Sequence, residues 1–405
     1  MKKNLLSHCF LTMFIFACST LHAQTFQLNE IWYKIISEDE IEVTGNNLDI
    51  NSEVVIPASV LYDGRQYKVT RIGSRSFQYS KNLTSIVIPN SVTSIGEGAF
   101  NDCYFLINIT MPSQMEEIGV GAFSGTSITS IRIPNGITNI EENVFSECKS
   151  LSKVTLPEGL VSIADNVFFG CLILKQLTLP NSVQSIGFQS FWHSGLTNIV
   201  LSDNLTRIGA QCFMGCEKLK SINIPNSVTS IGLGAFRDCK SLISAKLPNR
   251  LSIIPPDLFN GCTSLVSVKL SENATDIGAG TFSNCTSLSS INLPSSIVNI
   301  GRGSFSRCYS LSEVILPSNL LFIGENAFNE CSNLLSITLP ASLKEIQKEA
   351  FYNCQGLTVV TFKGKIPPSL GVKVFFGASG ARIMFPTESY ERYKSALHEY
   401  LSNIK

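Results

Sequence analysis

Histidine, net charge and long apolar segments are what this 405-residue chain has little of. It holds four histidines, and Lys plus Arg equals Asp plus Glu at 31 each. Without a net field, the chain is not expected to attract nucleic acid or an anionic membrane surface. Charged residues make up 15% and hydrophobic residues 44%, which is typical of a well-packed extracellular protein and not of a disordered one.

The scarcity of histidine limits the chemistry that the chain can perform. Beyond the N-terminal segment, the histidines are His193 and His398, in different regions of the sequence. Zinc sites need His and Cys ligands at convergent spacing. Nucleophilic catalysis needs a base beside its Ser or Cys. The sequence therefore predicts no catalytic residue, no metal site and no cofactor, and a protein that is not an enzyme.

One apolar stretch stands out, at the N-terminus. Lys2 and Lys3 precede "CFLTMFIFAC", and Ala23 ends a small-residue cleavage site. The stretch is shorter than the ~20 residues that a spanning helix needs. We expect residues 1–23 to be a signal peptide and the mature chain to be secreted or at the cell surface, with no integral membrane segment. An alternative interpretation makes "IFAC" a lipidation site, with a lipid anchor at Cys18.

What the sequence has in abundance is a repeat. A marker proline recurs about every 23 residues, an Ile follows six residues later, and a Phe follows five residues after the Ile. The markers run from Pro89 to Pro340, with Ser202 and Ser271 in place of proline in two copies. Copies that cannot bury their apolar side alone must stack, so this regularity predicts a solenoid and not several globular domains.

Each repeat is expected to contain two short strands and a turn. An L-x-x-I-x-I pattern precedes the proline, and its alternating apolar residues indicate a strand with one buried face. Proline ends that strand because it has no N–H to donate. A second short strand such as "VTSI" follows, and "EGAF" is expected to form a helical or 3₁₀ turn. Stacked copies should give parallel strands and a right-handed superhelix.

The full pattern, L-x-x-I-x-I-P-x-x-V-x-x-I-G-x-x-A-F-x-x-C, resembles the leucine-rich repeats of BspA-like, or Treponema pallidum-type, proteins of Bacteroides-like bacteria. The resemblance covers about residues 55–362. It implies a β-rich leucine-rich-repeat solenoid. It also implies a secreted or surface-attached protein that binds other proteins or cells.

The flanking segments also resemble that family. Residues 24–54, which include "WYKIISEDEIEVTG", look like an N-terminal β-hairpin cap, and residues 363–405 look like a closing strand and helix. Between them, residues 55–362 are predicted to hold about 13 repeats, the first with a loop inserted around Asp63–Gly64. Caps make physical sense because an open solenoid exposes apolar residues and strand edges.

Cysteine recurs three residues after the repeated Phe. Neighbouring copies at about 4.8 Å fall within the Cα range of a disulfide, but parallel side chains do not give the dihedral angle that the bond needs. Thr126 and Ser194 replace the cysteine in the two shortened copies, which favours buried thiols; a few disulfides or metal binding are the alternatives. These cysteines are Cys103, Cys148, Cys171, Cys216, Cys239, Cys262, Cys285, Cys308, Cys331 and Cys354, and Cys212 is a further core cysteine.

Outward residues of the first strand should form a continuous wall that is mildly basic in its middle and rich in hydroxyl groups. One interpretation is a broad protein- or glycan-binding face. The other is a generic exposed sheet of residues that fit strands. The candidate binding residues on the wall are Arg132, Lys153, Lys175, Lys220, Ile243, Lys246, Val266 and Lys269. The loop residues Trp192, His193 and Tyr104 are further candidates because aromatic residues are enriched at binding hot spots.

These observations predict an exported, non-enzymatic protein that mediates adhesion or protein–protein interaction. Its partner is expected to be a protein of the host matrix or of a neighbouring cell, held along the solenoid surface. The alternative is a structural or glycan-binding component of the cell envelope without a specific protein ligand.

Overall fold

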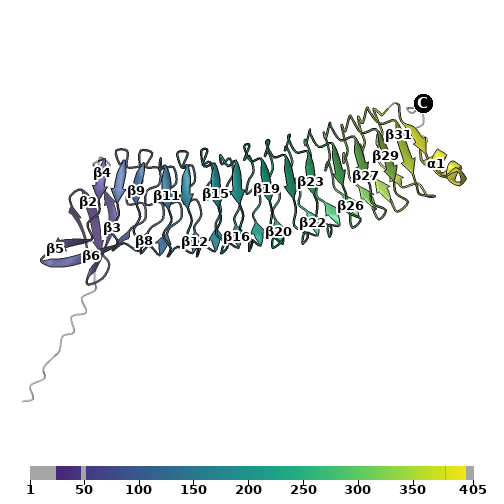
Figure 1. Cartoon of the computed structure of the whole chain (residues 1–405). Coiled ribbons are helices and arrows are strands. Elements are labelled where there is room, and N and C mark those ends of the chain that lie inside the picture. The colour runs from purple at the N-terminus through teal and green to yellow at the C-terminus, as the bar shows by residue number, and fades with distance from the viewer. Residues whose placement is uncertain (1–23, 47–51, 379, 398–405) are drawn as a thin grey trace, which may run out of the picture.

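The computed structural model describes residues 24–46, 52–378 and 380–397. They form one elongated, gently curved solenoid with strands of an N-terminal cap at one end and the short helix α1 (Tyr390–Ala396) at the other (Figure 1). Two rows of short strands run along it. Row 1 contains the strand of each L-x-x-I-x-I segment, and row 2 contains the strand that ends at the repeated Ile. The predicted solenoid of parallel strands is confirmed.

Row 1 begins beside the N-terminal cap and continues to the last turn of the solenoid. Its strands are β4 (Glu53–Val55), β7 (Ser85–Val87), β9 (Asn108–Thr110), β11 (Ser130–Arg132), β13 (Lys153–Thr155), β15 (Gln176–Thr178), β17 (Asn198–Val200), β19 (Ser221–Asn223), β21 (Ser244–Lys246), β23 (Ser267–Lys269), β25 (Ser290–Asn292), β27 (Glu313–Ile315), β29 (Ser336–Leu339), β31 (Val359–Phe362) and β33 (Arg382–Met384).

Row 2 runs along the opposite side of the solenoid from row 1. Its strands are β6 (Arg65–Ile72), β8 (Ser94–Ile95), β10 (Glu117–Ile118), β12 (Asn139–Ile140), β14 (Ser162–Ile163), β16 (Ser185–Ile186), β18 (Arg207–Ile208), β20 (Ser230–Ile231), β22 (Ile253–Ile254), β24 (Asp276–Ile277), β26 (Asn299–Ile300), β28 (Phe322–Ile323), β30 (Glu345–Ile346) and β32 (Ser369–Leu370).

Neighbouring repeats pair in register in both rows. In row 2, Ile163 of β14 lies opposite Ile186 of β16, and in row 1 Ile222 of β19 lies opposite Ala245 of β21. Because the strands are parallel and the side-chain period is two, equivalent residues of successive repeats point the same way. The labels β9, β11, β15 and β19 therefore follow one side of Figure 1 and β8, β12, β16 and β20 the other.

The turn after row 2 differs from the expected helical or 3₁₀ turn. The backbone N–H groups of Gly98, Phe100 and Asp102 donate to carbonyls of the next repeat at 2.9, 2.8 and 2.8 Å. Only the N–H groups of the residues between them donate to carbonyls of their own repeat. Consecutive 3₁₀ hydrogen bonds therefore cannot form. Gly98 and Asp102 both have φ of 57°, which turns alternate N–H groups towards the neighbouring repeat. The turn is thus a third line of hydrogen bonds between repeats.

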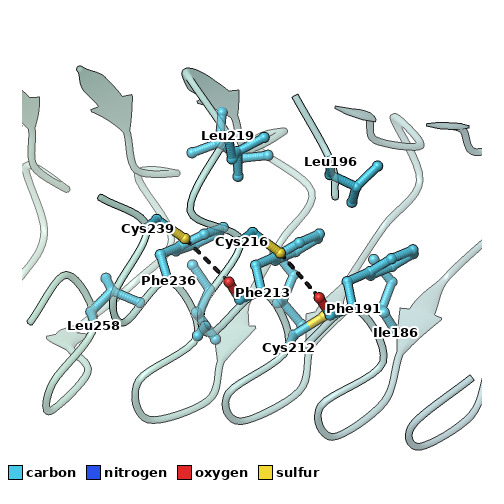
Figure 2. Close-up of a cluster of buried hydrophobic side chains, with 14 of the residues drawn as sticks. Ile186, Phe191, Leu196, Cys212, Phe213, Cys216, Leu219, Phe236, Cys239 and Leu258 are labelled. Carbon is cyan, nitrogen blue, oxygen red and sulfur yellow. Dashed lines mark hydrogen bonds between the residues drawn. The ribbon is translucent and has the colours of Figure 1, made fainter. Parts of the chain in front are cut away.

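A ladder of phenylalanine rings fills the core. From Phe77 to Phe375, rings of successive repeats lie 5.1–5.8 Å apart between centroids, with interplanar angles of 1–16°. Figure 2 shows three of these rings, Phe191, Phe213 and Phe236, stacked in parallel. Stacked aromatic pairs add about 0.5–1.5 kcal/mol to the effect of burial alone. The ladder therefore couples each repeat to both of its neighbours.

A line of cysteine thiols runs beside the rings. The thiols of Cys216 and Cys239 donate to the main-chain carbonyls of Phe191 and Phe213 in the preceding repeats, at 3.0 and 3.2 Å (Figure 2). In the described chain, the cysteines from Cys103 to Cys354 are free and buried, so the predicted buried thiols are confirmed. Each thiol thus supplies a hydrogen bond between repeats in addition to filling the core.

The two shortened repeats use a hydroxyl group in place of the thiol. The Thr126 hydroxyl donates to the Phe123 carbonyl at 2.8 Å, and its oxygen lies 3.3 Å from the Cys148 sulfur. The Ser194 oxygen likewise lies 3.3 Å from the Cys216 sulfur. A small polar group is thus accepted at this position because its partners are carbonyls and neighbouring thiols.

The N-terminal cap continues row 2. Strands β1 (Thr25–Leu28), β2 (Ile31–Ile35) and β3 (Glu40–Asn46) form antiparallel pairs, and β3 pairs in parallel with β6. The loop predicted around Asp63–Gly64 is the tip of a hairpin between β5 (Ser59–Tyr62) and β6. Both tip residues have positive φ, 46° and 73°, as a two-residue hairpin turn requires.

The C-terminal cap closes the other end. After β33, the chain forms the 3₁₀ helix η1 (Thr387–Ser389) and then α1. Tyr393 of α1 is fully buried, and its hydroxyl donates to the Gly364 carbonyl at 2.9 Å. Its ring stacks on Phe385 at 4.8 Å, so the helix covers apolar surface that the last repeat exposes. The chain division at residues 24–54, 55–362 and 363–405 stays a prediction.

Removing one ring should test the ladder. Phe213→Ala is expected to lower the free energy of unfolding by about 3–5 kcal/mol, because it leaves a cavity between two stacked rings. Phe188→Ala is the matched control, since Phe188 is 40% exposed and lies outside the ladder. Urea unfolding of both variants measures the difference, and equal losses would contradict a stacked core.

The buried thiols predict loss of stability at alkaline pH. Burial raises the pKa of Cys103, Cys148, Cys216 and Cys354 from the ordinary value of 9.0 to about 12. The stabilisation is complete below pH 9.0, where thiols of both states are protonated. It is lost as the pH rises towards 12, because the unfolded thiols ionise first.

Urea unfolding across that pH range measures the effect, and a cysteine variant separates it from other groups. Tyrosines also titrate there, since burial raises the pKa of Tyr33 and Tyr393 to about 12. Cys216→Ala should therefore be less stable than the parent at neutral pH and lose less stability on alkalinisation. Parallel pH profiles for parent and variant would contradict the assignment.

Candidate functional site

The cysteines do not form a reactive site. The thiolate is the nucleophile and the metal ligand, and burial raises the pKa of these thiols, which disfavours that form. Among the residues that the structure describes, no group of three or more His, Cys, Asp or Glu side chains could hold a metal ion. His398 lies outside the described residues. A binding site is therefore expected on the surface and not in the cysteine-lined core.

Row 1 brings the strand candidates onto one face. Arg132, Lys246 and Lys269 end the strands β11, β21 and β23, and Lys153 begins β13. The remaining strand candidates stand directly before β15, β19, β21 and β23: they are Lys175, Lys220, Ile243 and Val266. All of these side chains are exposed, including the apolar Ile243 at 52% and Val266 at 46%.

The loop candidates do not join this face. Trp192 and His193 lie in the turn after Phe191, between row 2 and row 1. The half-buried Trp192 ring packs edge-on against Phe169 at 4.7 Å, with His193 5.1 Å away. Tyr104 lies in a turn of another repeat and is 57% exposed. These aromatic residues therefore do not contribute to a surface shared with the lysines.

The cations of row 1 have no carboxylate partner in the described chain. From Thr84 to Asn292, the outward residues of this row are neutral or basic, and Glu313 in β27 is the next carboxylate on the face. Ion pairs occur instead in the turns, such as Lys240–Glu217 at 2.7 Å. A chain with no net charge thus presents uncompensated positive charge along row 1.

Many hydroxyl groups of row 1 are occupied by the fold. The first outward Ser or Thr of a repeat donates to a carbonyl of the preceding repeat: Thr84 to Ser52 at 2.8 Å and Ser152 to Thr129 at 3.0 Å. The predicted hydroxyl-rich wall is therefore only partly available to a ligand. Ser130 belongs to the remaining set: its backbone is part of the pairing of β11 with β13, but its hydroxyl group forms no hydrogen bond with another described residue.

Row 1 is interrupted at several junctions, and two of them open into clefts. Strands β9 and β11 do not pair, nor do β13 and β15, whereas β19, β21 and β23 form one continuous sheet. The first cleft has a volume of about 470 Å³ and is lined by Thr110, Ser130 and Arg132 among others. The second has a volume of about 330 Å³ and is lined by Thr155, Gln176 and other residues.

Sequence reasoning missed these clefts. The first lies beside the repeat that is one residue shorter after Phe123, and row 2 is also interrupted there, between β10 and β12. That deletion was a usable signal. The second cleft has no corresponding change in the sequence pattern.

Comparison with known proteins agrees with the repeat and the fold. The profile of the BspA type leucine-rich repeat region matches residues 70–197, 184–309 and 275–404. A leucine-rich repeat protein from Bacteroides ovatus is similar in structure, with 28% identity and a TM-score of 0.73, over 89% of this chain and 100% of that chain. No curated protein matches the sequence.

Two more distant structures share the fold. The pneumococcal vaccine antigen PcpA is 20% identical, with a TM-score of 0.57, over 95% of this chain and 97% of that chain. A leucine-rich repeat protein from Eubacterium ventriosum is 22% identical, with a TM-score of 0.51, over 75% and 93%. Together with the consensus read from the sequence and the two strand rows, the profile match shows that this chain belongs to the BspA-type leucine-rich-repeat family.

Proposed function

We propose that this chain is a non-enzymatic, exported interaction protein that holds a protein partner on the middle of row 1. The binding residues are Lys220, Ile243, Lys246, Val266 and Lys269, called the central patch from here on. A host matrix protein or a protein of a neighbouring cell is the proposed partner. Membership of a leucine-rich-repeat family supports an interaction role, since solenoids of this kind offer extended binding surfaces.

The observation that carries the proposal is an uncompensated pair of lysines. Lys246 and Lys269 lie directly opposite each other in the register of β21 and β23. Like charges in this position destabilise a sheet. Neither lysine forms an ion pair with another described residue, so the fold gains nothing from their charge. An acidic partner would supply the missing countercharge.

Apolar residues beside the lysines provide the other half of a protein site. Ile243 and Val266 are neighbours in successive repeats and are about half exposed. Buried apolar anchors supply most of the energy of protein interfaces, and surrounding charges steer the partner and fix its orientation. The continuous pairing of β19, β21 and β23 holds these side chains in place before binding, which reduces the entropic cost.

Export is proposed on the sequence of residues 1–23, which lie outside the described residues, as does Cys18. None of the helices in the described chain has the length and hydrophobicity needed to cross a membrane. Intact mass measurement of the protein from its native host should give a chain that starts at Gln24. A lipidated chain that starts at Cys18 would overturn that cleavage and support an anchor.

Substituting the central patch should abolish partner binding. The parent protein is first screened by surface plasmon resonance against purified extracellular-matrix proteins. For a protein that it binds, the variant Lys220→Gln, Ile243→Ser, Lys246→Gln, Lys269→Gln should bind at least about tenfold more weakly, since it loses an apolar anchor and unpaired charges.

A matched variant controls for total charge. Lys149→Gln, Lys344→Gln, Lys348→Gln removes as many lysines from surfaces outside row 1. It should bind like the parent. Equal binding by the central-patch variant and the parent, or equal weakening of both variants, would overturn the assignment of the site.

A further inference from the structure

We propose that the N-terminal part of row 1 is a second binding site, which takes a linear glycan with alternating acidic and neutral sugars. The site comprises Arg132, Lys153, Lys175 and the two clefts beside β11–β13, and is called the cleft site. It shares no residue with the central patch. The proposal therefore does not rest on a protein partner.

The cleft site has fewer apolar anchors than the central patch. Its outward strand residues are hydroxyl, amide or basic residues, and of the residues directly before its strands only Ile107 is apolar and exposed, whereas the central patch exposes the adjacent pair Ile243 and Val266. Protein interfaces depend on apolar and aromatic anchors. A polar, hydroxyl-bearing ligand is bound instead by convergent hydrogen-bonding side chains within a concave surface. The chemistry of this half of row 1 therefore fits a glycan better than a protein.

The first cleft suits an acidic sugar. Arg132 lines it and forms no ion pair within the described residues, so both edges of its guanidinium group can meet a carboxylate. Thr110 and Ser130 line the same cleft, and their hydroxyl groups have no hydrogen-bond partner in the described chain. A volume of about 470 Å³ leaves room for a sugar ring with its hydroxyl groups.

The second cleft suits a neutral sugar. Thr155, Gln176 and Thr178 offer hydroxyl and amide groups there, and Glu158 contributes a carboxylate. That carboxylate would repel an acidic sugar and would accept hydrogen bonds from the hydroxyl groups of a neutral one. The opposite charges of Arg132 and Glu158 therefore predict that the ligand alternates between acidic and neutral units.

The spacing of the two charges fits one linear chain. Arg132 of β11 pairs in register with Thr155 of β13, and Glu158 follows β13, so the two charges lie one repeat apart along the solenoid, or about 4.8 Å. That span is comparable with one sugar unit, so neighbouring acidic and neutral sugars can meet them. Lys153 begins β13 and Lys175 precedes β15, where both can meet acid groups further along the ligand. No backbone hydrogen bond joins β9 to β11 or β13 to β15, so N–H and C=O groups at these edges are further partners.

The test compares three glycans by isothermal titration calorimetry on the purified protein. Hyaluronan oligosaccharides alternate acidic and neutral sugars, polygalacturonate carries an acid on every sugar, and chitooligosaccharides are neutral. Hyaluronan should bind best, and raising the salt concentration should weaken it. No detectable binding of hyaluronan, or binding no stronger than that of polygalacturonate, would overturn the proposal.

Two triple variants locate the site. Arg132→Gln, Lys153→Gln, Lys175→Gln should weaken hyaluronan binding at least about tenfold, because it removes charge-assisted contacts. Lys220→Gln, Lys246→Gln, Lys269→Gln removes equal charge from the central patch and should leave hyaluronan binding within twofold of the parent. Equal losses in both would show unspecific charge attraction and overturn the site.

A pair of single variants tests the cleft without any change of charge. Ser130→Tyr places a bulky side chain in the first cleft and should weaken hyaluronan binding. Ser221→Tyr places the same side chain at the equivalent position of β19, away from both clefts, and should not. Circular dichroism shows whether both variants fold like the parent. If Ser130→Tyr folds and binds normally, the cleft is not the site.

The two proposed sites fail independently. Loss of a matrix-protein interaction in the central-patch variant, with hyaluronan binding retained, supports both. If hyaluronan does not bind, and an acidic protein binds the parent but not the Arg132, Lys153, Lys175 variant, this half of row 1 takes a protein. That result would overturn the glycan proposal and leave the central patch intact.

Discussion

Stacking of repeats in register is the constraint on which the rest of this structure depends. Each repeat lies one strand spacing from the next, so every inward side chain rests on its own counterpart. A residue type that stacks well on itself is then required at that position in every copy. The parallel rings from Phe77 to Phe375 satisfy this requirement, as do the thiols that bond the carbonyls of preceding Phe residues. Repetition of Phe and Cys thus follows from the packing and gives no evidence of chemistry.

The same constraint makes outward charge informative. Stacked like charges repel, and the turns avoid this by pairing residues of opposite sign in neighbouring repeats, as in Arg75–Glu97 at 2.9 Å. Row 1 instead places Lys246 opposite Lys269 and leaves Arg132 beside an open cleft. The fold could accommodate neutral residues at these positions. We propose that their charge serves ligands, an acidic protein surface at one part of the row and a glycan at another.

The fold could be predicted from the sequence because the same residue pattern recurs in every repeat. The alternating Ile residues and the marker proline placed both strand rows, and the Thr126 and Ser194 replacements identified the buried thiol position. The turn was expected to be helical or 3₁₀, but its alternate N–H groups, such as that of Phe100, find partners in the next repeat, which the sequence of a single repeat does not reveal. The clefts were not predicted because they lie where neighbouring strands of row 1 do not pair, and the repeat pattern does not show which strands these are. Trp192 and His193 were proposed as loop candidates, and they lie in a turn apart from the lysines of row 1.

The central claim is that packing fixes the repeated positions while function resides in the outward residues of row 1. A library of single substitutions over residues 84–292, displayed on cells, measures this directly when each variant is scored for folded display and for binding to hyaluronan or a matrix protein. The account predicts that substitutions in the Phe and Cys ladders reduce display, whereas substitutions that reduce binding but not display gather at the cleft site and the central patch. Binding-specific losses gathered instead in row 2 or in the turns around Trp192 would contradict it.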